Sequence, residues 1–139
     1  MKYFIFLLIS LSTIVSGADS HWEKMIIEKI LQSVSNQKEL TIYTQDEEIL
    51  KIVKTINNIH MVHSCQKADF VLSTLDNTSS CHKPVLLFSY NEYKHTPDAI
   101  GVFFWQKGRP TIRFSSQRLK NFGLHVDGEL SKFVTAKAY

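Results

Sequence analysis

Side chains of metal-binding type are concentrated in one stretch of the chain, which contains His60, His63, Cys65, Cys81 and His82. Imidazole nitrogens and thiolates are common zinc ligands, but this spacing matches no recognised zinc site, and on a strand His60 would face away from His63. Cys81-His82 resembles the end of the C-x-x-C-H haem-attachment motif, but Thr78 occupies the place of its first cysteine. We expect a structural disulfide between Cys65 and Cys81, with a metal site near the histidines as the alternative.

Common catalytic motifs do not occur in the sequence. G-x-S-x-G, H-E-x-x-H, the P-loop and G-x-G-x-x-G are all missing, and no serine stands in a nucleophile context. The turn Thr44-Gln45-Asp46 would lie at the carboxyl edge of a sheet, where α/β proteins bind ligands. However, Asp46 places a negative charge there and no glycine lets the backbone approach a phosphate, so we expect helix capping. We predict no enzymatic activity and no cofactor.

The most informative stretch covers residues 99–122, where the pattern predicts a strand, a tight turn, a second strand and a short helix. Its aromatic residues either fill a core covered by helices or form a contact surface, since Trp and Arg are enriched in binding hot spots. We expect Phe104, in step with Ile100 and Val102, to be core. The residues predicted to bind a protein partner are Phe103, Trp105, Lys107 and Arg109.

Within this stretch and the residues that follow it, a pattern is formed by Gly101, Gly108-Arg109, Ile112 with Phe114, Gly123-Leu124, and Leu130 with Phe133. In these residues the chain resembles the YfiR-like family of small periplasmic regulators. Ser115-Ser116 replaces the family's isoleucine-asparagine, and the family's usual set of cysteines is not reproduced. The resemblance implies an α/β fold. It also implies binding to the periplasmic part of a membrane-bound diguanylate cyclase, which the family represses.

Hydrophobic periodicity predicts the remaining elements. Capping boxes at Ser20 to Glu23 and at Thr44 to Glu47 would open helices over residues 21–34 and about 47–56. Strands are expected at residues 39–43, 60–65, 68–75 and 84–90, with a polar link at 91–98 and a last short helix after Asp127. The predicted fold class is α/β, a single domain with a largely parallel sheet, flanking helices and a C-terminal antiparallel hairpin.

The first 18 residues have the pattern of a secretory signal peptide. Lys2 precedes an apolar run that ends near Val15, and Ser16-Gly17-Ala18 supplies a cleavage site. An uncleaved membrane anchor is the alternative, but the run is shorter than the roughly 20 residues that a span needs. We expect a periplasmic domain at residues 19–139 with no membrane insertion after cleavage. The net charge of +3, without a basic stripe, gives no indication of a nucleic-acid partner.

These patterns lead to one predicted function and one alternative. The first is a non-catalytic periplasmic regulatory protein that binds the sensor domain of an inner-membrane signalling enzyme, a diguanylate cyclase or a kinase. The alternative is a small periplasmic solute-binding protein that delivers a ligand to a transporter. The chain has room for only one lobe, whereas such receptors usually close two lobes on a ligand.

The first testable prediction concerns the disulfide. A Cys65–Cys81 bond closes a loop of about 15 residues, worth on the order of 3 kcal/mol in the chain-entropy model. Cys65→Ser and Cys81→Ser should each lower the melting temperature, and the double variant little further, because both remove one shared bond. Thiol titration of the denatured, unreduced protein should find no free thiol. Two titratable thiols would contradict this prediction and favour the metal alternative.

Overall fold

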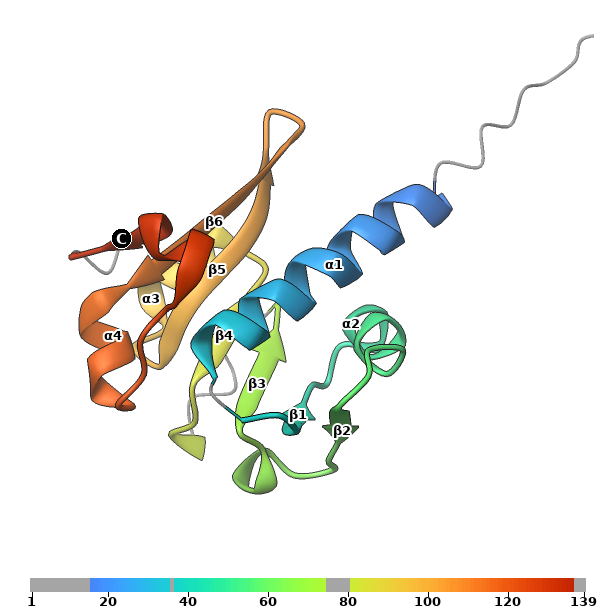
Figure 1. The fold of residues 1–139 in the computed structure, drawn as a ribbon, viewed down its shortest axis with the longest axis horizontal. Coiled ribbons are helices and arrows are strands. Elements are labelled where there is room, and N and C mark those ends of the chain that lie inside the picture. The colour runs from blue at the N-terminus through green and yellow to red at the C-terminus, as the bar shows by residue number, and fades with distance from the viewer. Residues whose placement is uncertain (1–15, 36, 75–80, 137–139) are drawn as a thin grey trace, which may run out of the picture.

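The computed structural model describes residues 16–35, 37–74 and 81–136, with side chains described from His21 onward. Its strands form one sheet flanked by helices (Figure 1). The helices are α1 (Ser16–Val34), α2 (Glu47–Val53), α3 (Tyr90–His95) and α4 (Ser116–Asn121), with short 3-10 helices η1 (Cys65–Lys67) and η3 (Gly128–Phe133). The strands are β1 (Leu40–Tyr43), β2 (Ile59–Met61), β3 (Phe70–Ser73), β4 (Val85–Leu87), β5 (Ala99–Gln106), β6 (Arg109–Ser115) and β7 (Val134–Thr135).

The described strands pair in the order β2-β1-β3-β4-β5-β6-β7. Neighbours from β2 to β5 are parallel, β5 and β6 are antiparallel, and β6 and β7 are parallel. The predicted α/β fold with a largely parallel sheet and a C-terminal hairpin is therefore confirmed. After β1 the chain adds β2 on one side of it and then adds β3 on its other side. The strand order therefore reverses between β1 and β3, which makes this the topological switch point of the sheet.

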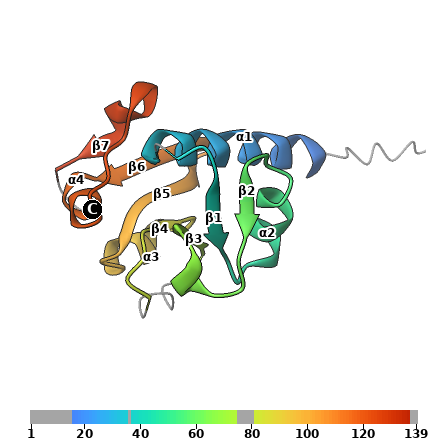
Figure 2. The same ribbon diagram turned by 60° about the horizontal axis from the view of Figure 1, so that its bottom comes forward.

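Helices cover the sheet on both faces (Figure 2). On one face, α1 and α2 bury residues such as Ile30 and Val53 against Ile42 and Leu72 of the sheet. On the other face, Tyr93 of α3 packs against a smaller apolar cluster that is centred on β3, β4 and β5. Two-sided coverage is the usual arrangement for a parallel sheet and explains the nearly continuous apolar runs in its strands.

The glycine in β5 is required by close packing across the hairpin. Gly101 lies opposite Phe114 of β6. A methyl group added at Gly101 would lie 2.7 Å from the Phe114 Cδ1 atom and 3.1 Å from the carbonyl oxygen of Arg113. Because Phe114 is fully buried, its ring has no free space into which to move. The aromatic ring therefore occupies the place that any other side chain at position 101 would need.

An extra residue in β5 overturns one expectation. Val85 pairs with Ala99 and Leu86 with Gly101, so Ile100 forms a bulge between them. Ile100 consequently packs in the core beneath α1, whereas Val102 packs on the α3 face. The prediction that Ile100, Val102 and Phe104 share one face is wrong for this reason. Phe104 is half-buried and packs with Val102 against the cluster on the α3 face.

The hairpin turn has the geometry that its sequence predicts. Lys107 and Gly108 both have positive φ, at 50° and 75°, which is the requirement of a two-residue type I′ turn. Gln106 pairs with Arg109 immediately beside the turn, and Trp105 pairs with Pro110. The backbone of the tip is thus held in register up to the two turn residues.

A buried arginine joins α4 to the region where α3 ends and β5 begins. The Arg118 guanidinium donates hydrogen bonds to the carbonyl oxygens of Tyr93 (2.7 Å), Ala99 (3.1 Å) and Lys94 (3.4 Å). It also lies 4.9 Å from the centre of the Tyr93 ring. Burial lowers the pKa of Arg118, while interaction with Tyr93 and Asp98 opposes that shift. Arg118 therefore satisfies carbonyl groups that the end of a helix leaves without intrahelical donors.

Several boundaries differ from the predicted ones. Helix α1 begins at Ser16, so the capping box predicted at Ser20 to Glu23 lies inside the helix. Residues 1–15 of the predicted signal peptide lie outside the described residues. The predicted strand at 60–65 shortens to β2 and is followed by η1. The predicted polar link at 91–98 contains helix α3, and β7 was not predicted. Short elements such as these depend on tertiary packing more than on local sequence pattern.

The second testable prediction concerns Gly101. Gly101→Ala should destabilise the protein by about 1–3 kcal/mol, because the new methyl group overpacks the hairpin against Phe114. Phe114→Leu in the same chain should recover part of that loss, since a smaller side chain relieves the clash, and the pair should be non-additive in urea denaturation. Equal stability of Gly101→Ala and the unaltered protein would contradict this packing.

Candidate functional site

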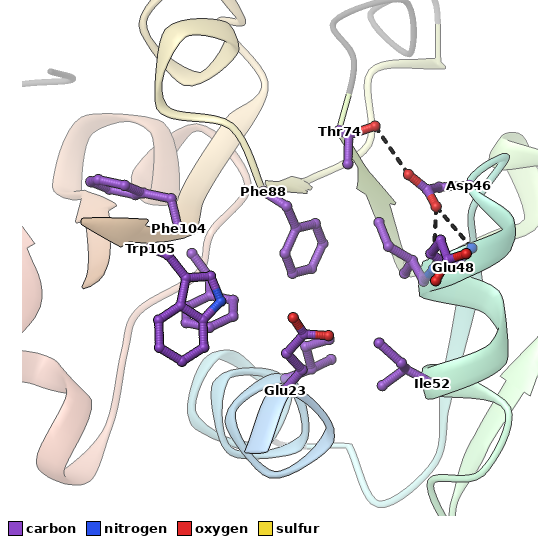
Figure 3. A pocket seen from close by; sticks show the side chains of 11 residues that line it. Glu23, Asp46, Glu48, Ile52, Thr74, Phe88, Phe104 and Trp105 are labelled. Carbon is purple, nitrogen blue, oxygen red and sulfur yellow. Dashed lines mark hydrogen bonds between the residues drawn. The ribbon is translucent and has the colours of Figure 1, made fainter. Parts of the chain in front are cut away.

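A cleft of about 290 Å³ opens at the carboxyl ends of the parallel strands (Figure 3). The connections after β1, β3 and β4, the end of β5, and helices α1 and α2 all contribute to it. Its lining residues are Glu23, Ile27, Asp46, Glu48, Ile49, Ile52, Thr74, Phe88, Phe103, Phe104 and Trp105. In open α/β sheets ligands bind beyond the carboxyl ends of the strands where the strand order reverses, which is the position of this cleft.

A hydrogen-bonded pair spans that reversal point. Asp46 follows β1 and Thr74 follows β3, and the Thr74 hydroxyl donates to the Asp46 carboxylate over 3.0 Å. The other oxygen of Asp46 accepts from the backbone N–H groups of Glu48 and Ile49 at the start of α2. The pair thus holds two strand ends and one helix start together at one side of the cleft (Figure 3).

The turn after β1 caps α2, as predicted, but with a different residue from the one expected. The N-cap of α2 is Asp46, whereas the capping-box pattern had predicted Thr44. Thr44 instead accepts a hydrogen bond from the backbone N–H of Asp46 through its own hydroxyl, over 3.1 Å. Asp46 therefore caps the helix by satisfying two of its first N–H groups, while the Thr44 hydroxyl stabilises the turn that leads into the helix.

Aromatic rings form one wall of the cleft. The Phe103 ring contacts the Phe88 ring edge-to-face at 6.2 Å and the Trp105 ring at 6.1 Å. Opposite them, the Glu23 carboxylate extends from α1 toward Phe88, between Trp105 and Ile52 (Figure 3). No local sequence pattern predicts that residues 23, 88 and 105 meet, because residue 23 belongs to a helix near the start of the chain, residue 88 follows β4 and residue 105 lies in β5.

The four residues predicted to bind a partner are not equally accessible. Phe103 is 3% exposed and belongs to the core beneath α1, so it reaches the surface only as part of the cleft wall. Trp105 is 47% exposed, and Lys107 and Arg109 are exposed at the hairpin tip. Figure 1 shows the β5–β6 hairpin extending past the rest of the sheet. Binding of a partner by these residues stays a prediction.

Two further exposed apolar side chains lie near the hairpin. Trp22 (58% exposed) and Met25 (48%) line a groove of about 340 Å³ between α1 and the hairpin strand β6, together with Pro110 and Ile112. Trp22 and Met25 recur at helical spacing with Ile26, Ile30 and Val34, and this spacing predicts that they share the apolar face of the helix. That prediction is wrong for Trp22 and Met25, because the buried side chains of α1 are Ile27, Ile30, Leu31 and Val34. We call Trp22, Met25, Trp105, Pro110 and Ile112 the apolar surface.

The predicted disulfide is confirmed: Cys65 and Cys81 are bonded, with their Cα atoms 6.1 Å apart. A structural disulfide indicates an oxidising, extracytoplasmic compartment.

Because they are bonded to each other, Cys65 and Cys81 are unavailable as thiolate ligands for a metal ion. Within the described residues no group of three or more His, Cys, Asp or Glu side chains is placed to hold a metal ion, and His60 and His82 lie near different acids, Glu39 and Asp98. None of the helices in the described residues combines the length and the apolar character that a membrane span requires.

Comparison of the sequence with models of known protein families finds no match, and comparison with curated proteins finds none. The functional argument therefore depends on the residues and their geometry. The resemblance to the YfiR-like family stays a prediction.

The third testable prediction concerns the hydrogen-bonded pair Asp46 and Thr74. Asp46→Ala should cost about 1 kcal/mol for the lost cap, and Thr74→Val about 0.5–1.5 kcal/mol for the lost hydrogen bond. The double variant should lose less than the sum in urea denaturation, because the two changes remove one shared bond. Ser131→Ala, a distant change in η3, should add to Asp46→Ala within experimental error. Strict additivity of Asp46→Ala and Thr74→Val would contradict the coupling.

Proposed function

We propose that this protein is an exported, non-catalytic regulator that docks on the outward-facing sensor domain of an inner-membrane signalling enzyme. The observation that carries the proposal is the exposed apolar surface beside a basic hairpin tip. Three large hydrophobic side chains, Trp22, Met25 and Trp105, are each about half exposed in the described part of the chain, at 58%, 48% and 47%. Exposed apolar side chains that gather in one region are typical of protein-binding sites.

The residue types on this surface suit a protein partner. Tryptophan, methionine and arginine are enriched in protein interfaces, and tryptophan and arginine dominate their energetic centres. Lys107 and Arg109 add positive charge at the tip, which favours an acidic surface on the partner and increases the rate of association. The paired strands hold these side chains in place, so binding needs little ordering of the backbone.

Location supports the same function. The Cys65–Cys81 disulfide indicates an extracytoplasmic compartment, and the signal-peptide pattern of residues 1–18 favours the periplasm. A protein in that compartment has access to the outward-facing domains of inner-membrane enzymes. The resemblance of residues 99–124 to YfiR-like regulators agrees with a diguanylate cyclase or a kinase as the partner.

A second candidate function is favoured by the cleft. A concave site at the carboxyl edge of a parallel sheet is where a small ligand would bind, so the protein could serve as a periplasmic solute-binding protein that delivers its ligand to a transporter. The described residues form a single sheet, whereas solute receptors usually close two lobes around the ligand. We therefore place regulatory docking first.

The fourth testable prediction separates docking residues from core residues. Arg109→Ala should change the stability by less than about 0.5 kcal/mol, because the side chain is exposed, and should weaken partner binding by more than about 1 kcal/mol. Trp105→Ala should also leave a folded protein, but one that no longer represses its partner. Circular dichroism and binding to the purified sensor domain would measure both effects.

A matched control is Lys120→Ala, which removes an exposed positive charge from α4, away from the hairpin tip. This variant should bind the partner normally. If Arg109→Ala binds as well as Lys120→Ala and Trp105→Ala unfolds the protein, the contact surface lies elsewhere.

A further inference from the structure

We propose that the cleft beside α1 binds a small organic cation, in which an ammonium group is carried on an apolar body. The inference rests on the cleft being a small-molecule site, as the second candidate function also requires. It does not rest on docking of the hairpin. The argument combines the shape of the cleft, the chemistry of its walls and the sign of its charges.

The dimensions of the cleft suit a small molecule. Its volume of about 290 Å³ lies near the lower end of the range for ligand pockets, which is roughly 300–1,000 Å³. Its walls are mostly apolar, with a small number of polar groups, as is usual for such sites. The Asp46–Thr74 hydrogen bond holds the strand ends on one side of the cleft together.

The charges of the cleft have one sign. The charged side chains among the described residues that line it are Glu23, Asp46 and Glu48, all carboxylates, and no lysine or arginine is among them. The Asp46 carboxylate is engaged by Thr74 and by the start of α2, so it contributes mainly its field. An anionic ligand in this space would lie beside three carboxylates, whereas a cation would be attracted by all of them.

The aromatic wall adds a second attraction for a cation. The Glu23 carboxylate extends toward Phe88, with Trp105 on one side of it (Figure 3). Phe103, which contacts both rings, completes this wall. The face of an aromatic ring attracts cations, and quaternary and alkylated ammonium ions are recognised by aromatic cages. An ammonium group placed here would contact ring faces and a carboxylate together, while its apolar body would contact Ile27 and Ile52.

Three ligands with one carbon skeleton test the charge preference. Phenethylammonium, 2-phenylethanol and phenylacetate are cationic, neutral and anionic at pH 7, and each can be titrated into the protein by calorimetry. We expect phenethylammonium to bind at least about tenfold more tightly than 2-phenylethanol, and phenylacetate not to bind. Amide chemical-shift changes should be centred on Asp46, Thr74 and Phe88. The inference is overturned if phenethylammonium shows no saturable binding at millimolar concentration, or if the three ligands bind equally.

A pair of matched variants tests the role of Glu23. Glu23→Gln should weaken phenethylammonium about tenfold but change 2-phenylethanol by less than about twofold, because only the charge is removed. Glu28→Gln removes the same charge from α1 at a position that does not line the cleft, and should change neither affinity by more than about twofold. Equal effects of the two variants would overturn the inference.

These measurements also separate the inference from the proposed docking function. They use the protein without a partner, and they leave Trp105 and Arg109 unchanged. Equal binding of all three ligands would contradict the charge preference while leaving the cleft as a small-molecule site. Loss of partner binding in Arg109→Ala would bear on the hairpin tip alone.

Discussion

A parallel sheet must be covered on both faces, and the way in which α1 covers one face produces both candidate binding surfaces. The helix buries Ile27, Ile30, Leu31 and Val34 against the sheet. These residues lie in its C-terminal half, so the N-terminal half extends past the strands (Figure 1). One side of that extension closes the cleft through Glu23, and another exposes Trp22 and Met25 beside the hairpin. Both candidate surfaces thus follow from a helix that is longer than the sheet beneath it.

Parts of the fold that depend on local signals could be predicted from the sequence. The Lys107-Gly108 turn needs positive φ at two adjacent positions, and glycine at the second position indicates it directly. Two cysteines in a chain with an export pattern leave few alternatives to a disulfide. The buried strands were visible as apolar runs. Each of these features depends on residues that are near one another in sequence, or on the number of a residue type.

What depends on pairing between distant segments could not be predicted. The bulge at Ile100 is defined by how β5 pairs with β4, so no pattern within β5 itself indicates it. Because of the bulge, Ile100 packs on the face opposite to Val102. The exposure of Trp22 and Met25 depends on where the sheet ends beneath α1. Part of the candidate site was visible: the turn that contains Asp46 as a helix start, and Trp105 at the end of a strand. Glu23 and Phe88 were not, because their functional meaning comes from their position opposite each other across the cleft.

The shortness of the outermost strands limits how this protein can meet another. Of the strands described, β2 has three residues and β7 has two, and they are the two edges of the sheet. An edge strand offers unpaired N–H and C=O groups to a neighbouring chain, and short edges offer few of them. Edge-to-edge pairing and capture of an extended peptide by β-augmentation are therefore disfavoured at β2 and β7. The longer strand β6 differs, because β7 pairs only with its last two residues, Phe114 and Ser115. Among the described strands, the outer side of Arg109–Arg113 near the hairpin tip is therefore where backbone pairing with another chain is least restricted.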